Sequence, residues 1–253
     1  MDSKVIVITG ASEGIGAVLA KQLAAQGHKL VLAARRIEPL QAVAAECGDA
    51  IAVAADVTKR ADMEKLRDEA IAEFGHVDVW VNNAGRGITR PVMELTDEDM
   101  DDMWSVNVKS VMYGAQAIVP HFKERGSGQL INVSSFLSRI PMASVRSVYS
   151  ACKAAVNSLT ANMRNDLRGT GVNVTLVIPG LVKTRFHANT KHVPDTPPVL
   201  PPGMQAQTPE EVAEVMVRAI ENPVPEVYTN PAHAPIAAKY YQDVAAFEAQ
   251  AAG

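Results

Sequence analysis

The amino-acid sequence predicts an α/β fold built on a doubly wound, parallel β-sheet. Short apolar runs rich in β-branched residues, such as residues 5–8 and 172–178, alternate with longer runs of helical pattern, which is the order of elements in a parallel sheet. Glycine-rich or polar motifs follow the apolar runs, as ligand-binding motifs do at the carboxyl ends of parallel strands. No linker or repeat divides the 253 residues, so we expect residues 1–253 to form a single domain.

The composition excludes several classes of protein. The net charge is −4 and the pI is about 5.9, without a block of lysines or arginines, so we expect neither nucleic acid nor an anionic membrane as a partner. No apolar run approaches the roughly 18 residues of a membrane span. The two cysteines lack the spacing of zinc ligands, so we expect no metal. The first strand begins near residue 4, which leaves no room for a signal peptide and indicates a cytoplasmic protein.

The first strand leads into a glycine-rich turn over residues 9–16, a helix over residues 17–26 and a second strand over residues 29–34. In such a unit glycines permit a tight turn and close approach of a ligand to the backbone, and the helix N-terminus attracts phosphate. A simple tight connection would also use glycines, but the strand–turn–helix–strand context favours a dinucleotide site. The candidate binding residues are Gly10, Ser12, Gly14, Ile15 and Gly16.

The end of the second strand bears on the choice of cofactor. Proteins that bind NAD usually place an acid there for the ribose 2′-hydroxyl, whereas an arginine accommodates the 2′-phosphate of NADP. Here Arg35 and Arg36 follow the strand, and the first acid is Glu38. This arrangement predicts NADP(H), with Arg35 as the main phosphate partner and Arg36 assisting it. The alternative is that both arginines are solvated and contact no phosphate. Glu13, near the glycine-rich turn, argues mildly for NAD.

The alternation continues to the end of the chain. Further strands are predicted over residues 51–54, 77–81, 129–133, 172–178 and 226–229, and helices over residues 60–74, 97–125, 149–167, 209–221 and 239–252. Polar or glycine-containing motifs stand at the ends of four of these strands, and the sheet topology brings them to one edge: Asp56 and Val57, residues 82–85, Ser134 and Ser135, and Pro179 and Gly180.

Tyr149 and Lys153 stand four residues apart in the predicted helix over residues 149–167. Residues with this spacing share one helix face, so a phenol and an ammonium group would face the same cleft. An adjacent ammonium favours the phenolate and lowers the pKa of the tyrosine towards the range useful for general acid–base catalysis. The pattern Tyr-x-x-x-Lys is common and acquires weight only from the other motifs.

Three motifs occur together in order: TGxxxGxG over residues 9–16, NNAG over residues 82–85, and YxxxK from Tyr149 to Lys153. With them the sequence resembles the short-chain dehydrogenase/reductase family from Val5 to Thr184. The resemblance implies a Rossmann-like domain that binds NAD(P) and catalyses hydride transfer between nicotinamide and a small-molecule carbonyl or alcohol. It also implies a homodimer or homotetramer.

The resemblance assigns binding roles to individual residues. It implies that the glycine-rich turn holds the cofactor pyrophosphate. It places Asp56 and Val57 against the adenine ring. Along the adenosine side it places Asn83, Ala84 and Gly85, which also brace the neighbouring strand. For the nicotinamide end it implies Pro179, Gly180, Val182 and Thr184, together with Tyr149 and Lys153.

The implied catalytic residues are Asn107, Ser135, Tyr149 and Lys153. Tyr149 would exchange the proton, Lys153 would lower its pKa and hold the nicotinamide ribose, and Asn107 would support a water that links Lys153 to solvent. Taken singly, Asn107 would be a surface residue of a helix. The family usually has its serine 13 residues before the tyrosine, which is Phe136 here. We therefore expect Ser135 in this role, with one extra loop residue, and Ser134 as the second choice.

Residues 185–207 contain five prolines, which preclude a long helix. The resemblance implies a substrate-covering loop there; an ordered surface loop is the alternative. Apolar residues of 136–145 predict an apolar substrate pocket: Phe136, Leu137, Ile140, Met142 and Val145. Two other functions remain open. One is a 3-oxoacyl-thioester reductase, for which a basic docking patch would be expected. The other is a catalytically silent NADPH-binding regulatory protein, which would be expected to lack Tyr149 or Lys153.

Overall fold

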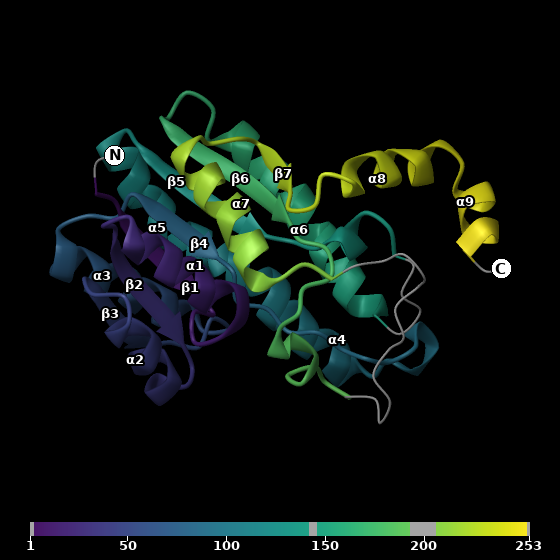
Figure 1. The fold of residues 1–253 in the computed structure, drawn as a ribbon, viewed down its shortest axis with the longest axis horizontal. Helices are drawn as coiled ribbons and strands as arrows, with labels where there is room; N and C mark the ends of the chain where they lie inside the picture. Colours follow the sequence, from purple (N-terminus) through teal and green to yellow (C-terminus); the bar gives the residue numbers. More distant parts are fainter. Residues whose placement is uncertain (1–2, 142–145, 193–205, 252–253) are drawn as a thin grey trace.

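The computed structural model describes residues 3–141, 146–192 and 206–251. Within these ranges a seven-stranded sheet has the order β3-β2-β1-β4-β5-β6-β7, and every neighbouring pair is parallel (Figure 1). The direction of winding reverses at β1, which pairs with β2 on one side and β4 on the other, so the doubly wound parallel sheet is confirmed. The strands are β1 (Val5–Thr9), β2 (Lys29–Ala34), β3 (Ala50–Ala54), β4 (Val79–Asn82), β5 (Gly128–Val133), β6 (Val172–Ile178) and β7 (Glu226–Tyr228).

Helices connect the strands at nearly the predicted positions. β4 begins at Val79 rather than at residue 77, and α6 begins two residues before Tyr149. The predicted helical stretch over residues 97–125 is confirmed but contains a π-helical turn, η2 (Ser105–Lys109). The helices are α1 (Gly14–Ala25), α2 (Ile37–Ala45), α3 (Arg60–Phe74), α4 (Asp97–Trp104), α5 (Ser110–Arg125), α6 (Ser147–Asp166), α7 (Pro209–Glu221), and the short 3-10 turns η1 (Val92–Glu94), η3 (Phe136–Ser138) and η4 (Arg185–His187).

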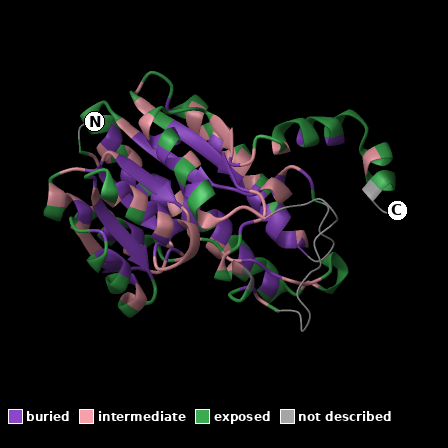
Figure 2. Cartoon of the chain, in the orientation of Figure 1, coloured by how far each residue is buried: buried purple, intermediate pink, exposed green. Residues whose placement is uncertain are grey.

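Both faces of the inner strands β1, β2, β4, β5 and β6 are largely buried (Figure 2). Successive strand residues point to opposite sides, and helices cover each side. Ile6 and Ile8 of β1 pack on the face covered by α1, α2 and α7. Val5 and Val7 pack on the opposite face, which α3 and α5 cover. Helix α6 covers this second face farther along the sheet, against β6. The strands therefore lack the alternation of apolar and polar residues that a half-exposed sheet would show.

The C-terminal helix predicted over residues 239–252 is wrong in its bounds. The structure has two helices there, α8 (His233–Gln242) and α9 (Val244–Ala251), and residue 252 lies outside the described residues. Between them Asp243 has an extended backbone, and its carboxylate accepts the N–H of Ala246 at 2.9 Å, so it caps α9. Both helices extend away from the sheet, and much of their surface is exposed (Figures 1 and 2).

Among the helices that the structure describes, none combines the length and the hydropathy required to cross a lipid bilayer. Within the same residues, no group of three or more histidine, cysteine, aspartate or glutamate side chains is arranged to hold a metal ion. Cys47 and Cys152 are buried free thiols.

Candidate active site

The glycine-rich turn between β1 and α1 forms a cradle whose shape requires glycine. Gly10 and Gly14 have positive φ angles of 67° and 59°, which other residues rarely adopt. A β-carbon on Gly10 would lie 2.8 Å from the Cα of Ala84, and one on Gly16 would lie 2.5 Å from the Gly10 carbonyl oxygen. The turn therefore leaves its backbone bare at the N-terminus of α1, where a pyrophosphate is favoured. These residues fit the predicted dinucleotide.

The Asn83 segment braces this turn, as predicted. The Thr9 hydroxyl accepts the backbone N–H groups of Asn83 and Ala84 at 3.1 and 3.2 Å. The Asn83 side chain donates to the carbonyl oxygens of Thr9 and Gly10 at 2.9 and 3.2 Å. Because both hydrogens of its amide nitrogen are used internally, Asn83 shapes the cradle through its side chain.

Charged residues lie at the ends of β2 and β3. Burial alone would raise the pKa of Asp56, but hydrogen bonds from Thr58 and the charge of Arg35 outweigh it and lower that pKa. Arg35 and Arg36 are both exposed. Arg36 lies 3.6 Å from Glu13, which also accepts a hydrogen bond from Asn189. Arg35 therefore remains the better candidate for a cofactor phosphate, because Arg36 already has an acidic neighbour.

The segment after β6 returns to the glycine-rich turn. Pro179 accepts the backbone N–H of Phe136 at 2.7 Å, and Gly180 gives room to the His233 ring, which would lie 2.2 Å from its β-carbon. Val182 is buried, and the Thr184 side chain lies 3.4 Å from the β-carbon position of Gly14. The segment predicted to meet the nicotinamide is thus adjacent to the turn predicted to hold the pyrophosphate.

Tyr149 and Lys153 lie on the same face of α6, as predicted. The Lys153 Nζ lies 5.8 Å from the centroid of the Tyr149 ring and donates to the Val133 carbonyl oxygen at 2.9 Å. Both side chains are buried, with 8% and 3% of their surface exposed. Phe186 packs against the tyrosine, with 5.7 Å between ring centroids. A phenol and an ammonium group therefore meet at the carboxyl end of β5.

Burial dominates the pKa values of this pair. It raises the pKa of Tyr149 to about 12, although a hydrogen bond with Ser135 and the charge of Arg146 act in the opposite direction. Burial also lowers the pKa of Lys153 to about 8. The expected lowering of the Tyr149 pKa by Lys153 is therefore not seen in the protein alone. Arg146, which the motifs did not single out, is the cation that exerts this effect.

Asn107 lies within the π-helical turn η2 and is completely buried. The surface position expected of this residue taken singly is therefore wrong. Its amide donates to the carbonyl oxygens of Arg86 and Met103, both at 3.0 Å, and its Oδ1 accepts the N–H of Arg86 at 3.2 Å. A β-carbon on Gly85 would lie 3.1 Å from this Oδ1 and 3.4 Å from the Lys153 Nζ. Two polar atoms therefore flank the same small space beside Gly85.

The two adjacent serines have different surroundings. Ser134 donates to the Asn157 side chain at 2.6 Å and contacts the Lys153 carbonyl oxygen at 3.1 Å. Ser135 accepts the N–H of Leu137 at 3.2 Å and lies near enough to Tyr149 to act on the pKa of its phenol. This geometry favours Ser135 over Ser134 as the serine that meets a reacting oxygen.

The residues predicted to line an apolar substrate pocket have different surroundings. Leu137 packs in the cluster that contains Tyr149. Phe136 instead packs between α6 and β6 with Val156 and Ile178, and its other face stacks on the His233 ring at 4.1 Å. Phe136 is therefore part of the core beneath the site. Residues 142–145 lie outside the described residues.

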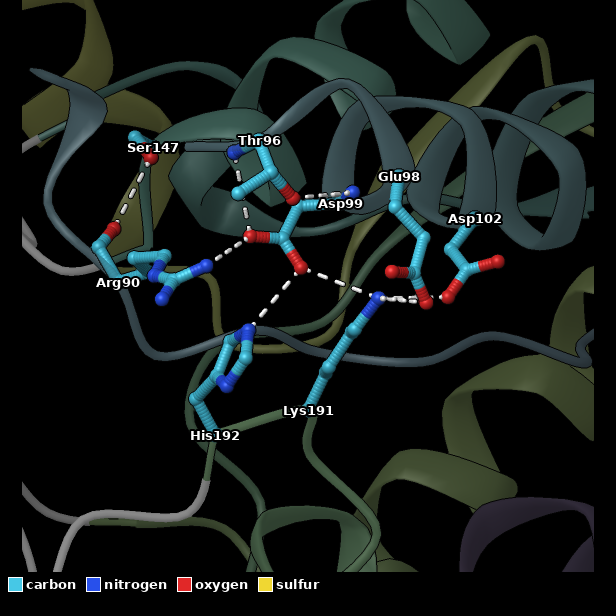
Figure 3. A network of polar contacts seen from close by, with 8 residues as sticks. All are labelled: Arg90, Thr96, Glu98, Asp99, Asp102, Ser147, Lys191 and His192. Carbon is cyan, nitrogen blue, oxygen red and sulfur yellow. Dashed lines mark hydrogen bonds and ion pairs between the residues drawn. The ribbon is translucent and has the colours of Figure 1, made fainter. Parts of the chain in front are cut away.

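The motifs also missed a network of charges around Asp99, which is 1% exposed (Figure 3). Its carboxylate accepts from Arg90 at 2.6 Å, from His192 at 3.0 Å and from Lys191 at 3.1 Å. Thr96 and Asp99 also form a capping box at the start of α4. The network ties Lys191 and His192 to α4. Its only signal in the sequence was the acid three residues after Thr96.

Residues 185–192 form the described part of the predicted substrate-covering loop. They include η4, and the backbone of Lys191 pairs with that of residues 87–89 at 2.9 Å. Residues 193–205 lie outside the described residues. The described part therefore lies over Tyr149, through Phe186, and is fixed at Lys191.

Three features are typical of an oxidoreductase that uses a dinucleotide: the doubly wound sheet, the glycine-rich turn and the buried pair of Tyr149 and Lys153. A family model described as short chain dehydrogenase matches residues 4–194. Since this match covers most of the sequence, the chain belongs to the short-chain dehydrogenase family. An uncharacterized oxidoreductase of Staphylococcus aureus strain USA300 is 35% identical over 225 residues, which span 88% of this chain and 93% of the relative.

Solved structures agree with this assignment. A 3-ketoacyl-(acyl-carrier-protein) reductase from Brucella melitensis, complexed with NADH, has a TM-score of 0.81 at 30% identity, with 90% of this chain and 96% of that chain covered. A serine dehydrogenase complexed with NADP⁺ has a TM-score of 0.80 at 32% identity, with 88% and 93% covered. Similar proteins thus bind either form of the cofactor.

Proposed function

We propose that this protein is an NADP(H)-dependent oxidoreductase that transfers hydride between nicotinamide and the carbonyl or alcohol carbon of a small molecule. The convergence of Ser135, Tyr149 and Lys153 at the carboxyl end of β5 is the observation that supports this function most strongly. When bound, the cofactor supplies or accepts the hydride. A catalytically silent NADPH-binding protein is disfavoured, because Tyr149 and Lys153 are both present and lie close together.

Each catalytic side chain has one task in the proposed reduction. The Tyr149 hydroxyl donates its proton to the oxygen of the substrate carbonyl, on which negative charge develops. The Ser135 hydroxyl donates a hydrogen bond to the same oxygen and fixes its position. Lys153 holds the nicotinamide ribose and stabilises the phenolate that remains. Asn107 and Lys153 flank the space beside Gly85, which is the proposed route by which the proton is replaced.

The preference for NADP(H) is the finer part of the proposal. Arg35 at the end of β2 would meet the 2′-phosphate, with Arg36 assisting it against the competing charge of Glu13. The binding residues proposed for the rest of the cofactor are those of the glycine-rich turn, of residues 56–57 and 83–85, and of residues 179–184.

Three further properties belong to the proposal. Residues 1–253 form one domain, the protein is cytoplasmic, and it assembles as a homodimer or homotetramer. The buried free thiols of Cys47 and Cys152 suit a reducing compartment. Exposed apolar side chains on η1 and α4, Met93 and Trp104 among them, suit a surface between subunits.

A 3-oxoacyl-thioester reductase is the second candidate function. The likeness to the reductase from Brucella melitensis favours it, whereas the absence of a run of lysines and arginines in the sequence weakens it. The two candidates share the same catalytic residues and differ in the substrate that the pocket accepts.

The test is oxidation of NADPH and NADH, followed by absorbance, with purified protein and a panel of ketones, aldehydes, oxo acids and a 3-oxoacyl thioester. The proposal expects turnover of free carbonyl compounds with NADPH preferred. Turnover of the thioester alone would select the second function. Absence of turnover across the panel, with cofactor bound, would contradict both and favour a silent binding protein.

A further inference from the structure

His233 is the first residue of α8 and packs against two segments of the candidate active site. One face of its ring stacks on Phe136, which directly follows Ser135, with 4.1 Å between ring centroids and 14° between ring planes. The ring edge points at Gly180, because a β-carbon there would lie 2.2 Å from the Cε1 atom of His233 and 3.1 Å from its Nδ1. One side chain thus joins the segment of Ser135 to residues 179–184, the nicotinamide segment, which is expected to meet the nicotinamide.

The ring of His233 explains why residue 180 is a glycine. Gly180 is not among the described glycines with a positive φ angle, so its backbone conformation does not itself require glycine. A side chain at this position would instead overlap the ring, because β-carbons do not approach other atoms to 2.2 Å. The close approach of the ring to the backbone is therefore the reason for the glycine.

Hydrogen bonds fix the start of α8 relative to the nicotinamide segment. The N–H of His233 donates to the Asn230 carbonyl oxygen at 3.0 Å. The neighbouring Thr229 donates its hydroxyl to the Gln207 side chain at 2.6 Å, and its carbonyl oxygen accepts from that side chain at 3.1 Å. The backbone of Gln207 in turn pairs with that of residues 181–183, in two hydrogen bonds of 2.9 Å. The ring therefore has a fixed origin from which to support the segment.

The ring acts through its shape and its aromatic contact. Within the described part of the chain, its Nδ1 is buried and has no hydrogen-bond partner. Burial lowers the pKa of His233, so the ring is neutral at pH 7 and stacks as an uncharged aromatic group. An unpaired buried nitrogen lowers stability, so support of the fold by a hydrogen bond from Nδ1 does not explain this histidine.

We propose that His233 is a positioning residue, whose ring sets the nicotinamide segment against the segment of Ser135 and thereby shapes the nicotinamide end of the cofactor site. It acts through Phe136 and Gly180 and not on the reacting atoms. This inference rests on the proposed function, since it concerns the geometry of the same site. The competing role is that of a core residue, in which the ring only fills space beneath the start of α8.

The two roles are separated by the binding of NADPH and of its fragment 2′-phospho-ADP-ribose, which lacks the nicotinamide. Calorimetry measures the Kd of both ligands for the native protein and for His233→Ala. The substitution should raise the Kd for NADPH by about threefold to tenfold, the size of one aromatic contact. It should leave the Kd for the fragment unchanged. A core residue would change both values or neither.

Gly180→Ala tests the same contact from the other side, and it also serves if His233→Ala does not fold. The added β-carbon lies against the ring, so this variant should show the same selective loss of NADPH affinity. When Gly180→Ala is combined with His233→Ala, its own effect should disappear, because the ring that it displaces is gone. Such a loss of additivity is the mark of two positions in direct contact.

His28→Ala is the matched control. His28 is a buried histidine, 3% exposed, whose Nδ1 accepts the N–H of Lys4 at 3.1 Å. It lies at the amino ends of β1 and β2, whereas the candidate site lies at the carboxyl ends. The substitution should lower thermal stability and leave the Kd of both ligands unchanged.

The outcomes that overturn the inference differ from those that overturn the proposed function. Equal weakening of both ligands in His233→Ala, or no weakening of either, would overturn the inference. So would an undiminished effect of Gly180→Ala in the double variant, or a native protein that binds the fragment as tightly as NADPH. Absence of turnover across the panel would contradict the proposed function alone, and a selective loss of NADPH affinity would still support the inference.

Discussion

The hydroxyl of Ser135 interacts with the phenol of Tyr149 and acts to lower its pKa, whereas the hydroxyl of Ser134 is turned away towards Asn157. Two neighbouring residues of one segment thus serve different purposes. One meets the side chain proposed to exchange the proton, and the other joins the end of β5 to α6. This division makes the two serines a matched pair for mutagenesis.

Ser135→Ala should lower kcat/KM by about 10²–10³, because the developing oxyanion loses a positioned donor, while thermal stability changes little. Ser134→Ala should retain most of the activity and lower the free energy of unfolding by about 1–3 kcal/mol, because it leaves buried partners unsatisfied. Initial rates and urea unfolding of both variants check these expectations. The reverse pattern would assign the role to Ser134.

Arg35→Ser should weaken the preference for NADPH over NADH by about tenfold to a hundredfold, because an exposed arginine–phosphate contact is lost. Arg36→Ser should have the smaller effect, since Arg36 has Glu13 as a neighbour at 3.6 Å. The ratio of kcat/KM for the two cofactors measures both effects. A native protein that prefers NADH would show that the end of β2 was misinterpreted.

Asp99→Asn should lower the free energy of unfolding at neutral pH by about 1–3 kcal/mol. Removing one member of a buried charge cluster is usually costlier, but Arg90, Lys191 and His192 are partly exposed and regain water. Asp102→Asn is the control, because Asp102 is 46% exposed and bonded only at the surface, where pairs contribute little. Equal effects of the two substitutions would contradict the role of the buried cluster.

The same cluster predicts the dependence of stability on pH. Burial would raise the pKa of Asp99, but the hydrogen bonds from Arg90, His192 and Lys191 prevail and hold that pKa well below its usual range. Its stabilising contribution is therefore complete above the pKa of the unfolded chain, about 3.9, and is lost as the pH falls below that value. The difference in stability between the native protein and Asp99→Asn should shrink below about pH 4. A difference that grows with acidity would contradict this sign.

Lys153 predicts the pH dependence of cofactor use. Burial lowers its pKa to about 8, so its ammonium charge is lost as the pH rises through that value. The kcat/KM for NADPH, which reports ionisations of the free enzyme, should therefore fall above about pH 8. Tyr149, with a pKa of about 12, keeps its proton throughout this range. Rates measured from pH 6 to 10 with limiting NADPH would reveal the fall, and a flat profile would exclude Lys153 as its source.

The fold was predictable because its signals are local. Ile6 and Ile8 face one layer and Val5 and Val7 the other, and such apolar runs are recognisable without knowledge of their neighbours. The break between α8 and α9 was missed although Asp243 is a common capping residue. The helical pattern continues on both sides of it, and neither proline nor glycine marks the end.

The parts of the site whose residues contact one another within a single sequence motif could be predicted. The spacing of Tyr149 and Lys153 on one helix is sufficient to bring them together. The Asp99 network could not be predicted in this way, because Arg90 and Lys191 meet Asp99 only after the loops have folded. Arg146 is intermediate, since its spacing from Tyr149 is local but its burial depends on Gly87 and Thr190.

The most direct test of the central claim is the rate of NADPH oxidation by Tyr149→Phe, measured beside the native protein on the best substrate of the panel. The account predicts a fall in kcat of at least about 10² to 10⁴, the contribution of a positioned general acid, with NADPH binding retained in a fluorescence titration. A variant that binds NADPH and turns over at the native rate would contradict the account.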